Sequence, residues 1–307
     1  MTDSKPFQIN TYFCFMYRLQ KVKRKNLDLE KYSKAIQQAL NYRVYAEYWY
    51  LDTLTDEKWE CWVWGDYEAI MPVPLQYKFG FKFVLQPTYC QQLGVFYKEE
   101  IPEELFREFE KVLHKYRVRS YCFNEENTEK YNPTGEKKVN YVLDLGSSYE
   151  EIKKISSKSS KWNAKQFEKS GLGINSNIDL KTILLKKEES NTFQLREKTR
   201  LKLSELLQTL SKRNLLLTKA VYQENEVVAF ACFIHSKNRI IYINSTSDQK
   251  GRKVCAPTGL LNDIIREYSK QPVLLDFEGS TNPNLASFFK GFGGEAKQYT
   301  IFSNFRF

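Results

Sequence analysis

Two carboxylates, Asp276 and Glu278, stand where side chains often carry chemistry. They close the apolar segment 273–278, which is expected to form a strand. Because side chains alternate along a strand, both carboxylates should lie on one face, at the carboxyl end, where open α/β sheets bind ligands. A carboxylate there can position a substrate group or accept its proton. The alternative is that each pairs with a nearby lysine or arginine.

A basic segment, 249–259, lies between an apolar strand and the start of a helix. A helix N-terminus leaves backbone N–H groups unpaired and carries partial positive charge, so it favours a phosphate. Arg252 and Lys253 add two full charges, while Gly251 and Gly259 loosen the backbone. The segment is therefore a candidate pyrophosphate cradle. A basic surface loop without a ligand is the alternative.

The helix expected over 148–169 carries a row of lysines interleaved with serines. Its start, Ser148 to Glu151, fits a capping box. The lysines are Lys153, Lys154, Lys158, Lys161, Lys165 and Lys169. Lysine and serine donors beside a single tryptophan suit phosphate contact, which makes Lys161 and Lys165 candidate substrate-binding residues. A solvated helix face explains the same pattern.

Two adjacent amides, Gln91 and Gln92, fall in another expected strand. Neighbouring strand residues point to opposite faces, so one of them should face inward, where its amide needs hydrogen-bond partners. It could bind an amide or hydroxyl of a substrate. It could equally satisfy neighbouring backbone groups.

Composition limits the class of protein. The 307 residues include 47 basic and 37 acidic ones, a net charge of +10. Residues 1–139 carry 21 basic and 20 acidic side chains, whereas residues 140–307 carry 26 and 17, so the second half should attract an anion. Six scattered cysteines without a CxxC and two histidines favour reduced thiols in the cytoplasm and no metal site. No apolar run is long enough to span a bilayer.

The order of expected elements indicates an α+β chain with a mixed sheet. Each half gives helical segments, a meander of strands, and then strand, helix and strand. The polar stretch 124–138 separates the halves. We therefore predict two domains, 1–139 and 140–307, the second containing the candidate donor-binding loop.

Several segments resemble the FemABX group, whose members have tandem GNAT-like (acyl-CoA N-acyltransferase) domains, and the resemblance covers roughly residue 28 to the end. It rests on Tyr45–Asp52, Met71–Pro74, Gln91–Phe96, Lys161–Lys165 with Gly171-Leu172, Asp276–Ser280, and the ending Asn282-Pro283 with Phe289–Gly293. The tail is similar to a GNAT ending, whereas Gln249-Lys250-Gly251-Arg252 is only a degraded GNAT glycine loop. Within this group the sequence resembles most the uncharacterised FemABX-like proteins of Bacteroidetes-type bacteria.

This resemblance implies an acyltransferase that moves an acetyl or aminoacyl group to the amine of a small molecule or peptide. Glu278, with Asp276 as second choice, would position or deprotonate that amine. If the donor is acyl-CoA, the implied donor-binding residues are Gln249, Gly251, Arg252, Lys253, Gly259 and Asn282. If the donor is a charged tRNA, the lysine-rich helix would contact its phosphates.

One departure from the family favours a different class, a non-catalytic binding protein on a GNAT scaffold. The position that often holds a thiolate-protonating tyrosine in GNAT enzymes is Phe289 here, and phenylalanine has no proton to give. The degraded glycine loop points the same way. The sequence does not indicate the oligomeric state.

Overall fold

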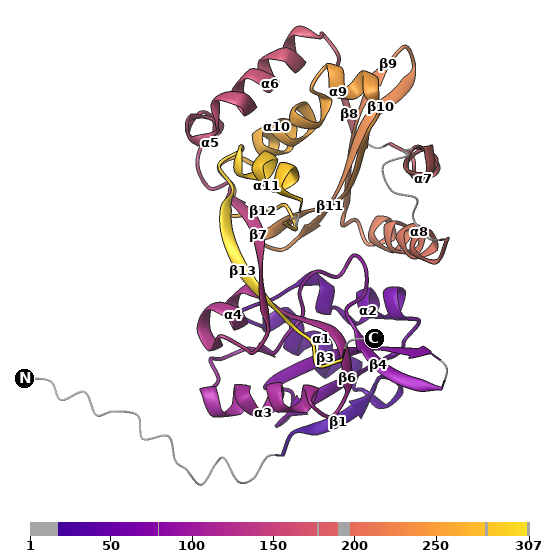
Figure 1. Cartoon of the computed structure of the whole chain (residues 1–307), viewed down its shortest axis with the longest axis vertical. Helices are drawn as coiled ribbons and strands as arrows, with labels where there is room; N and C mark the ends of the chain where they lie inside the picture. Colours follow the sequence, from indigo (N-terminus) through magenta and orange to yellow (C-terminus); the bar gives the residue numbers. More distant parts are fainter. Residues whose placement is uncertain (1–17, 79, 177, 190–196, 280–281, 306–307) are drawn as a thin grey trace, which may run out of the picture. The chain divides into compact units, whose positions relative to one another are not determined.

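The computed structural model describes residues 18–78, 80–176, 178–189, 197–279 and 282–305 (Figure 1). Its contacts divide the chain into two units. Unit 1 holds the residues up to Glu136 together with those from Thr300 onward, and unit 2 holds Lys137–Tyr299. The change of unit near Glu136 lies close to the predicted boundary, but the end of the chain returns to unit 1.

Unit 1 is built on a mainly antiparallel sheet. Its elements are β1 (Gln20–Lys23), η2 (Arg24–Asn26), α1 (Leu29–Gln38), η3 (Val44–Ala46), α2 (Tyr48–Thr55), β2 (Trp59–Trp64), β3 (Ala69–Lys78), β4 (Phe81–Leu85), β5 (Phe96–Tyr97), α3 (Glu103–Leu113), β6 (Arg117–Phe123) and α4 (Glu125–Tyr131). The strand order is β1-β2-β3-β4-β6, and β5 pairs with β3. Only β4 and β6 run parallel among these pairs, and the end of β13 (Glu295–Phe302) adds antiparallel to β6.

Strand β3 runs through Pro72 and Pro74, although proline cannot donate to a ladder and from sequence alone would be expected to end the strand. Pro72 lies opposite Cys61 and Pro74 opposite Trp59 in the pairing with β2. The amide of Leu75 donates to the Lys58 carbonyl on the β2 side. Backbone N–H directions alternate along a strand, so the nitrogens of Pro72 and Pro74 face away from β2. On that side the described partners of β3 are β5, before Pro72, and β4, after Pro74. The missing N–H groups therefore interrupt no ladder.

Two stretches of unit 1 contain helices that the sequence pattern did not predict. The aromatic segment 41–52 contains η3 and the start of α2, and Tyr45 and Tyr50 are fully buried in the core. The polar stretch expected to link the halves contains α4, whose N-cap Asn124 accepts from the Asn127 amide. Capping outweighed the polar composition there.

Unit 2 has its own mixed sheet. Its elements are β7 (Glu136–Asp144), α5 (Tyr149–Ile155), α6 (Lys158–Lys169), β8 (Ile174–Ser176), α7 (Leu180–Glu189), α8 (Glu197–Lys212), β9 (Leu216–Gln223), β10 (Glu226–Ser236), β11 (Arg239–Ser247), α9 (Gln249–Lys253), α10 (Ala256–Tyr268), β12 (Leu274–Asp276), α11 (Pro283–Lys290) and the start of β13. The strand order is β13-β7-β12-β11-β10-β9-β8. Only β11 and β12 run parallel among the pairs described.

Helices cover both faces of the unit 2 sheet (Figure 1). On one face α10 buries Leu260, Leu261, Ile264 and Ile265 among the apolar residues of β10 and α6. On the other face lie α7 and α8, and α8 buries its leucine stripe. The sequence also predicts a break in this helical region near Ser190-Asn191-Thr192, which lies outside the described residues. This two-sided cover fixes the sheet on which the candidate site is built.

The lysine-rich region is two helices rather than one. The capping box of α5 is present, with Ser148 and Glu151 bonding each other's backbone amides. Helix α5 ends at Ile155, and Ser157 caps α6 by accepting from the Ser160 amide. The serines that seemed to suit phosphate contact thus include two helix caps.

None of the described helices is long and apolar enough to cross a membrane. Within the described residues no group of three or more His, Cys, Asp or Glu side chains could hold a metal ion.

Candidate functional site

The carboxyl ends of β11 and β12 separate after a short parallel pairing. The last paired residues are Ile241 and Asp276, and β11 continues without β12 to Ser247. A β-bulge lies in this extension, because Cys232 of β10 pairs with Asn244 and the next β10 residue pairs with the β11 residue before Ile243. Ligands bind at the carboxyl ends of parallel strands in open sheets, and bulges often lie beside active sites. We call this place the β11–β12 opening.

Asn244 of β11 lies in the β11–β12 opening and has an unsatisfied donor. The residue is 7% exposed, and its Nδ2 finds no hydrogen-bond partner among the described residues. Such buried, unpaired groups are rare and call for an explanation. Beside it, Lys187 Nζ donates to the Ser245 carbonyl at 3.0 Å, and burial lowers the pKa of Lys187. Nothing in the sequence around Asn244 had singled it out.

Asp276 is buried within a complete set of partners. Its Oδ1 accepts from Asn140 Nδ2 and from the Glu278 amide, both at 2.9 Å. Its Oδ2 accepts from Arg239 Nη1 at 2.6 Å, and both members of this ion pair are at most 6% exposed. The alternative considered for these carboxylates, pairing with a basic residue, is therefore what Asp276 does.

Glu278 lies beyond the end of β12 and not within a strand. The structure places it in a loop with φ of 57°, a left-handed conformation that is uncommon outside glycine. Two hydrogen bonds hold this loop, because the Glu278 amide donates to Asp276 and the amide of Phe277 donates to the Tyr141 carbonyl at 2.9 Å. The Glu278 side chain is half-buried. Of the two predicted catalytic carboxylates it is the one with access to solvent.

The segment 249–259 forms the short helix α9 and the first turn of α10 rather than an open loop. Helix α9 is capped by Asp248, which accepts from the Gly251 amide at 2.7 Å. Further amides bond within the segment, namely Arg252 to Asp248, Val254 to Lys250, Cys255 to Arg252, and both Thr258 and Gly259 to Cys255. Pro257 has no N–H to offer. The segment, all of which the structure describes, thus presents few backbone donors to a pyrophosphate.

The glycines of this segment serve close packing. A Cβ on Gly251 would come within 2.4 Å of the Val228 carbonyl, and one on Gly259 would meet the Phe167 ring at the same distance. Both are buried. Asn282, the remaining predicted donor-binding residue, caps α11 by accepting from the Asn284 amide at 2.9 Å. Each of these three residues has a structural role in the described fold.

Lysines from the two predicted basic features meet at one surface hollow of about 490 Å³, which we call the lysine hollow. It is lined by Gln166, Lys169 and Ser170 at the end of α6, Gln223 and Glu224 of the β9–β10 hairpin, and Lys250, Lys253 and Val254 of α9 and the turn after it. Arg252 is not part of it, because its guanidinium donates to the Ser247 carbonyl. Gln249, another predicted donor-binding residue, lies on the exposed first turn of α9.

The two lysines predicted to bind substrate lie elsewhere on α6. Lys161 Nζ donates to the Lys154 carbonyl at 2.8 Å and so caps the end of α5. Lys165 is exposed, as is Trp162. Neither lysine lines the lysine hollow.

Gln91 and Gln92, the two glutamines predicted to bind substrate, hydrogen-bond to backbone and to neighbouring side chains. Gln92 is fully buried, and its Oε1 accepts from the Glu125 amide at 3.1 Å. Its Nε2 donates to Gln91 Oε1 at 2.9 Å and to Glu125 Oε1 at 3.2 Å. Of the two alternatives left open by the sequence, Gln92 follows the one in which the amide satisfies its neighbours.

Phe289 belongs to the core of unit 2. It is 2% exposed, and its ring stacks on Phe277 with centroids 4.9 Å apart. Tyr242 meets its edge at 6.0 Å. Burial raises the pKa of Tyr242 to about 12, so this phenol is protonated at neutral pH.

No family model matches the chain, and no curated protein matches its sequence. Solved structures do match its fold. FemX is 8% identical, with a TM-score of 0.65 over 93% of this chain and 98% of its own. L-PGS from Bacillus licheniformis is 13% identical, with a TM-score of 0.54 over 90% and 92%. The C-terminal domain of a protein described as a lysylphosphatidylglycerol synthetase, from Agrobacterium fabrum, is 8% identical with a TM-score of 0.54 over 89% and 90%. The chain therefore has a FemABX/GNAT-like fold.

Proposed function

We propose that the protein is an acyltransferase that transfers an acyl or aminoacyl group to an amine. The observation that carries the proposal is the β11–β12 opening, with its bulge and its buried, unpaired Asn244 donor. The fold supports it, because two of the structures that share it are an L-PGS and a domain described as a lysylphosphatidylglycerol synthetase. A shared fold by itself does not carry function.

The donor in this proposal is an acyl-CoA or an aminoacyl-tRNA. Two places in unit 2 could bind its phosphates. The segment 249–259 does not fit a pyrophosphate cradle made of backbone amides, since most of its amides bond internally and the Asp248 carboxylate occupies the tip of α9. The lysine hollow is the better anion site, because Lys169, Lys250 and Lys253 converge on it. Side-chain ammonium groups there would contact the phosphates of either donor.

In the proposed reaction the amine nitrogen attacks the donor carbonyl carbon. A C–N bond forms, and the bond from that carbon to the donor's sulfur or oxygen breaks, its electron pair leaving on the sulfur or oxygen. The amine gives up a proton, which balances the charge of the departing thiolate or alkoxide. We assign the proton to Glu278, the half-buried carboxylate beyond β12. Asn244 Nδ2 would donate to the carbonyl oxygen as negative charge develops on it. In other enzymes, removing one such donor lowers the rate by roughly 10²–10³-fold.

The test uses purified full-length protein with acetyl-CoA or a mixture of charged tRNAs and a panel of amines, followed by mass spectrometry of the products. Glu278→Gln should lower turnover strongly, whereas Glu295→Gln, at an exposed site on β13, should not. Asn244→Leu should also lower turnover while leaving the protein at least as stable, because it removes an unpaired buried donor. Unchanged turnover in Glu278→Gln would remove this assignment.

A second function has specific support. Phe289 fills the core position where a tyrosine could have donated a proton, and the amides of 249–259 are occupied, which favours a non-catalytic binding protein on the same scaffold. Melting with and without coenzyme A addresses it, because a ligand that binds only the folded state raises the melting temperature. A higher melting temperature without product formation from any donor would favour the binding protein. An unchanged melting temperature at millimolar coenzyme A would exclude acyl-CoA as the donor and favour aminoacyl-tRNA.

We further infer that the two units are copies of one plan. In unit 1 the parallel strands β4 and β6 are joined through α3, and α4 follows; in unit 2 the parallel strands β11 and β12 are joined through α10, and α11 follows. The next strand is exchanged in both, because β7 pairs with β12 while the end of β13 pairs with β6. A duplicated domain with swapped last strands accounts for this topology.

A further inference from the structure

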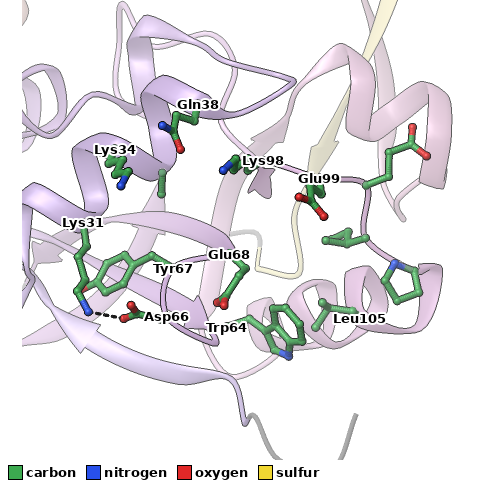
Figure 2. A pocket seen from close by; sticks show the side chains of 14 residues that line it. Lys31, Lys34, Gln38, Trp64, Asp66, Tyr67, Glu68, Lys98, Glu99 and Leu105 are labelled. Carbon is green, nitrogen blue, oxygen red and sulfur yellow. Dashed lines mark hydrogen bonds and ion pairs between the residues drawn. The ribbon is translucent and has the colours of Figure 1, made fainter. Parts of the chain in front are cut away.

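Unit 1 contains a pocket of about 620 Å³ that none of the predicted site residues lines. It lies between α1, the β2–β3 turn, the loop before α3 and the first turn of α3 (Figure 2). Its lining residues are Lys31, Lys34, Ala35, Gln38, Trp64, Asp66, Tyr67, Glu68, Lys98, Glu99, Glu100, Ile101, Pro102 and Leu105. The volume is in the range of small-molecule sites.

Part of the charge around the pocket is already neutralised. Lys31 Nζ lies 2.5 Å from Asp66 Oδ1, an ion pair at one side of the pocket (Figure 2). Glu100 Oε2 lies 2.6 Å from Lys130 Nζ. Tyr67 is also engaged, because its hydroxyl accepts from the Asp28 amide at 3.1 Å. These groups shape the wall and are not the ones available to a ligand.

Four charged side chains remain: two ammonium groups, Lys34 and Lys98, and two carboxylates, Glu68 and Glu99. Within the part of the chain that the structure describes, none of the four forms an ion pair within 4.0 Å. In Figure 2 Lys34 and Lys98 lie above the hollow and Glu68 lies below it. Opposite charges thus line one pocket without closing on each other, which leaves both signs open to a bound molecule.

The remaining wall is apolar. Ile101 and Leu105 are 8% and 9% exposed, so they present a fixed surface, and the half-buried indole of Trp64 lies beside them. Figure 2 shows Trp64 and Glu68 on the same side of the hollow. A ligand that fits this wall has an apolar part as well as charges. An indole face also suits contact with a cationic group.

We propose that this pocket binds a zwitterion with an apolar side chain, that is, a free amino acid or a short peptide with both ends charged. Its carboxylate would bind Lys34 and Lys98, its ammonium group would bind Glu68 and Glu99, and its side chain would lie on the Trp64 wall. A polyanion such as a phosphate ester fits less well, because the two carboxylates would repel it. The inference does not depend on the proposed transferase activity.

The test is calorimetric titration of the full-length protein with L-leucyl-L-leucine, its N-acetyl form and its C-terminal amide. The free dipeptide should bind, and each blocked form should bind about tenfold more weakly or worse, because each lacks one charge-assisted contact. Lys34→Gln and Glu68→Gln should weaken the free dipeptide by a similar factor, whereas Lys25→Gln, an exposed site away from the pocket, should not. Trp64→Phe should remove any change in tryptophan fluorescence on binding.

Thermal melts of Lys34→Gln, Glu68→Gln and Lys25→Gln should match the unsubstituted protein, because the replaced charges are exposed. Equal binding of the free and blocked dipeptides, or no heat with the free dipeptide at about 10 mM, would overturn the proposal. So would binding of inorganic phosphate that Lys34→Gln abolishes, since the pocket would then be an anion site. Each of these results leaves the transferase proposal standing, because that rests on unit 2.

Discussion

The buried ion pair between Asp276 and Arg239 allows a test of whether Asp276 has a structural or a catalytic role. In Asp276→Asn the side chain keeps its shape, and the new amide can still accept from Asn140 and from the Glu278 backbone. The Arg239 guanidinium, however, loses the carboxylate 2.6 Å away while it stays buried. A buried guanidinium that loses its carboxylate partner is strongly unfavourable.

The expected loss in unfolding free energy is about 3–5 kcal/mol, the range for breaking one side of a buried pair. Replacing both partners, in Asp276→Leu with Arg239→Met, should recover much of that loss, because apolar pairs of similar size are often neutral there. Asp144→Asn on β7 is the matched control, since this exposed carboxylate bonds only the nearby Gly146 amide among its described contacts, at 2.8 Å.

Urea unfolding followed by circular dichroism measures these differences. The chain has two units, so the transition has to be fitted for unit 2 by itself if two steps appear. A lower midpoint in Asp276→Asn, with the double variant close to the unsubstituted protein, is the expected result. If Asp276→Asn kept the midpoint and lost turnover in an acyl-transfer assay, the structural interpretation would be refuted and Asp276 would take the catalytic role.

Three further changes test the fold around the candidate residues. Gly259→Ala should lose about 1–3 kcal/mol of stability, since the new methyl group would meet Phe167 at 2.4 Å, and Phe167→Leu in the same chain should return part of it in thermal melts. Full stability together with weaker donor binding would instead make Gly259 a ligand residue. Gln92→Leu should cost about 1–3 kcal/mol in urea unfolding, because it leaves the first backbone amide of α4 unpaired at a buried site; an unchanged midpoint contradicts this. Ser148→Ala should lower the melting temperature more at pH 7 than at pH 3. The Ser148 hydroxyl lowers the pKa of Glu151, so this part of the stabilisation is present above the unfolded pKa of about 4.3 and lost as pH falls through the folded one, whereas the bond from the Glu151 amide to the Ser148 hydroxyl does not depend on pH; an equal gap in melting temperature at both pH values would disprove the linkage.

Elements with local signals were predictable. The capping box predicted at Ser148 depends on residues a few positions apart, and the structure confirms it. The hairpin about Gly65-Asp66 and the apolar stripe of α10 depend on equally local signals. The prolines of β3 are different, because their effect depends on which side of the strand carries the partner. Among the described strands, none pairs with Pro72 or Pro74 on the side opposite β2, and no short window of sequence shows that.

Charge and strand ends are visible in the sequence, so candidate site residues could be proposed from it. The partners of these residues could not be. Asp276 finds Arg239, 37 positions earlier, and Asn140, 136 positions earlier, and only the order of strands β7, β12 and β11 brings the three together. Asn244 was missed for a similar reason, since an asparagine in a strand is notable only once its donor is known to be buried and unpaired.

The donor segment shows why a basic, glycine-containing stretch before a helix does not by itself make a phosphate site. Backbone binding needs free amides, and Asp248, directly before the segment, is a typical N-cap residue that occupies one of them. Once the amides are taken, Gly251 and Gly259 are free to serve packing, and positive charge remains only on flexible side chains. Ammonium groups on such side chains can follow a donor of many shapes but fix none, so recognition of the donor has to come from elsewhere. Under the proposed function, the β11–β12 opening, with Asn244 on strand β11, would supply that geometry.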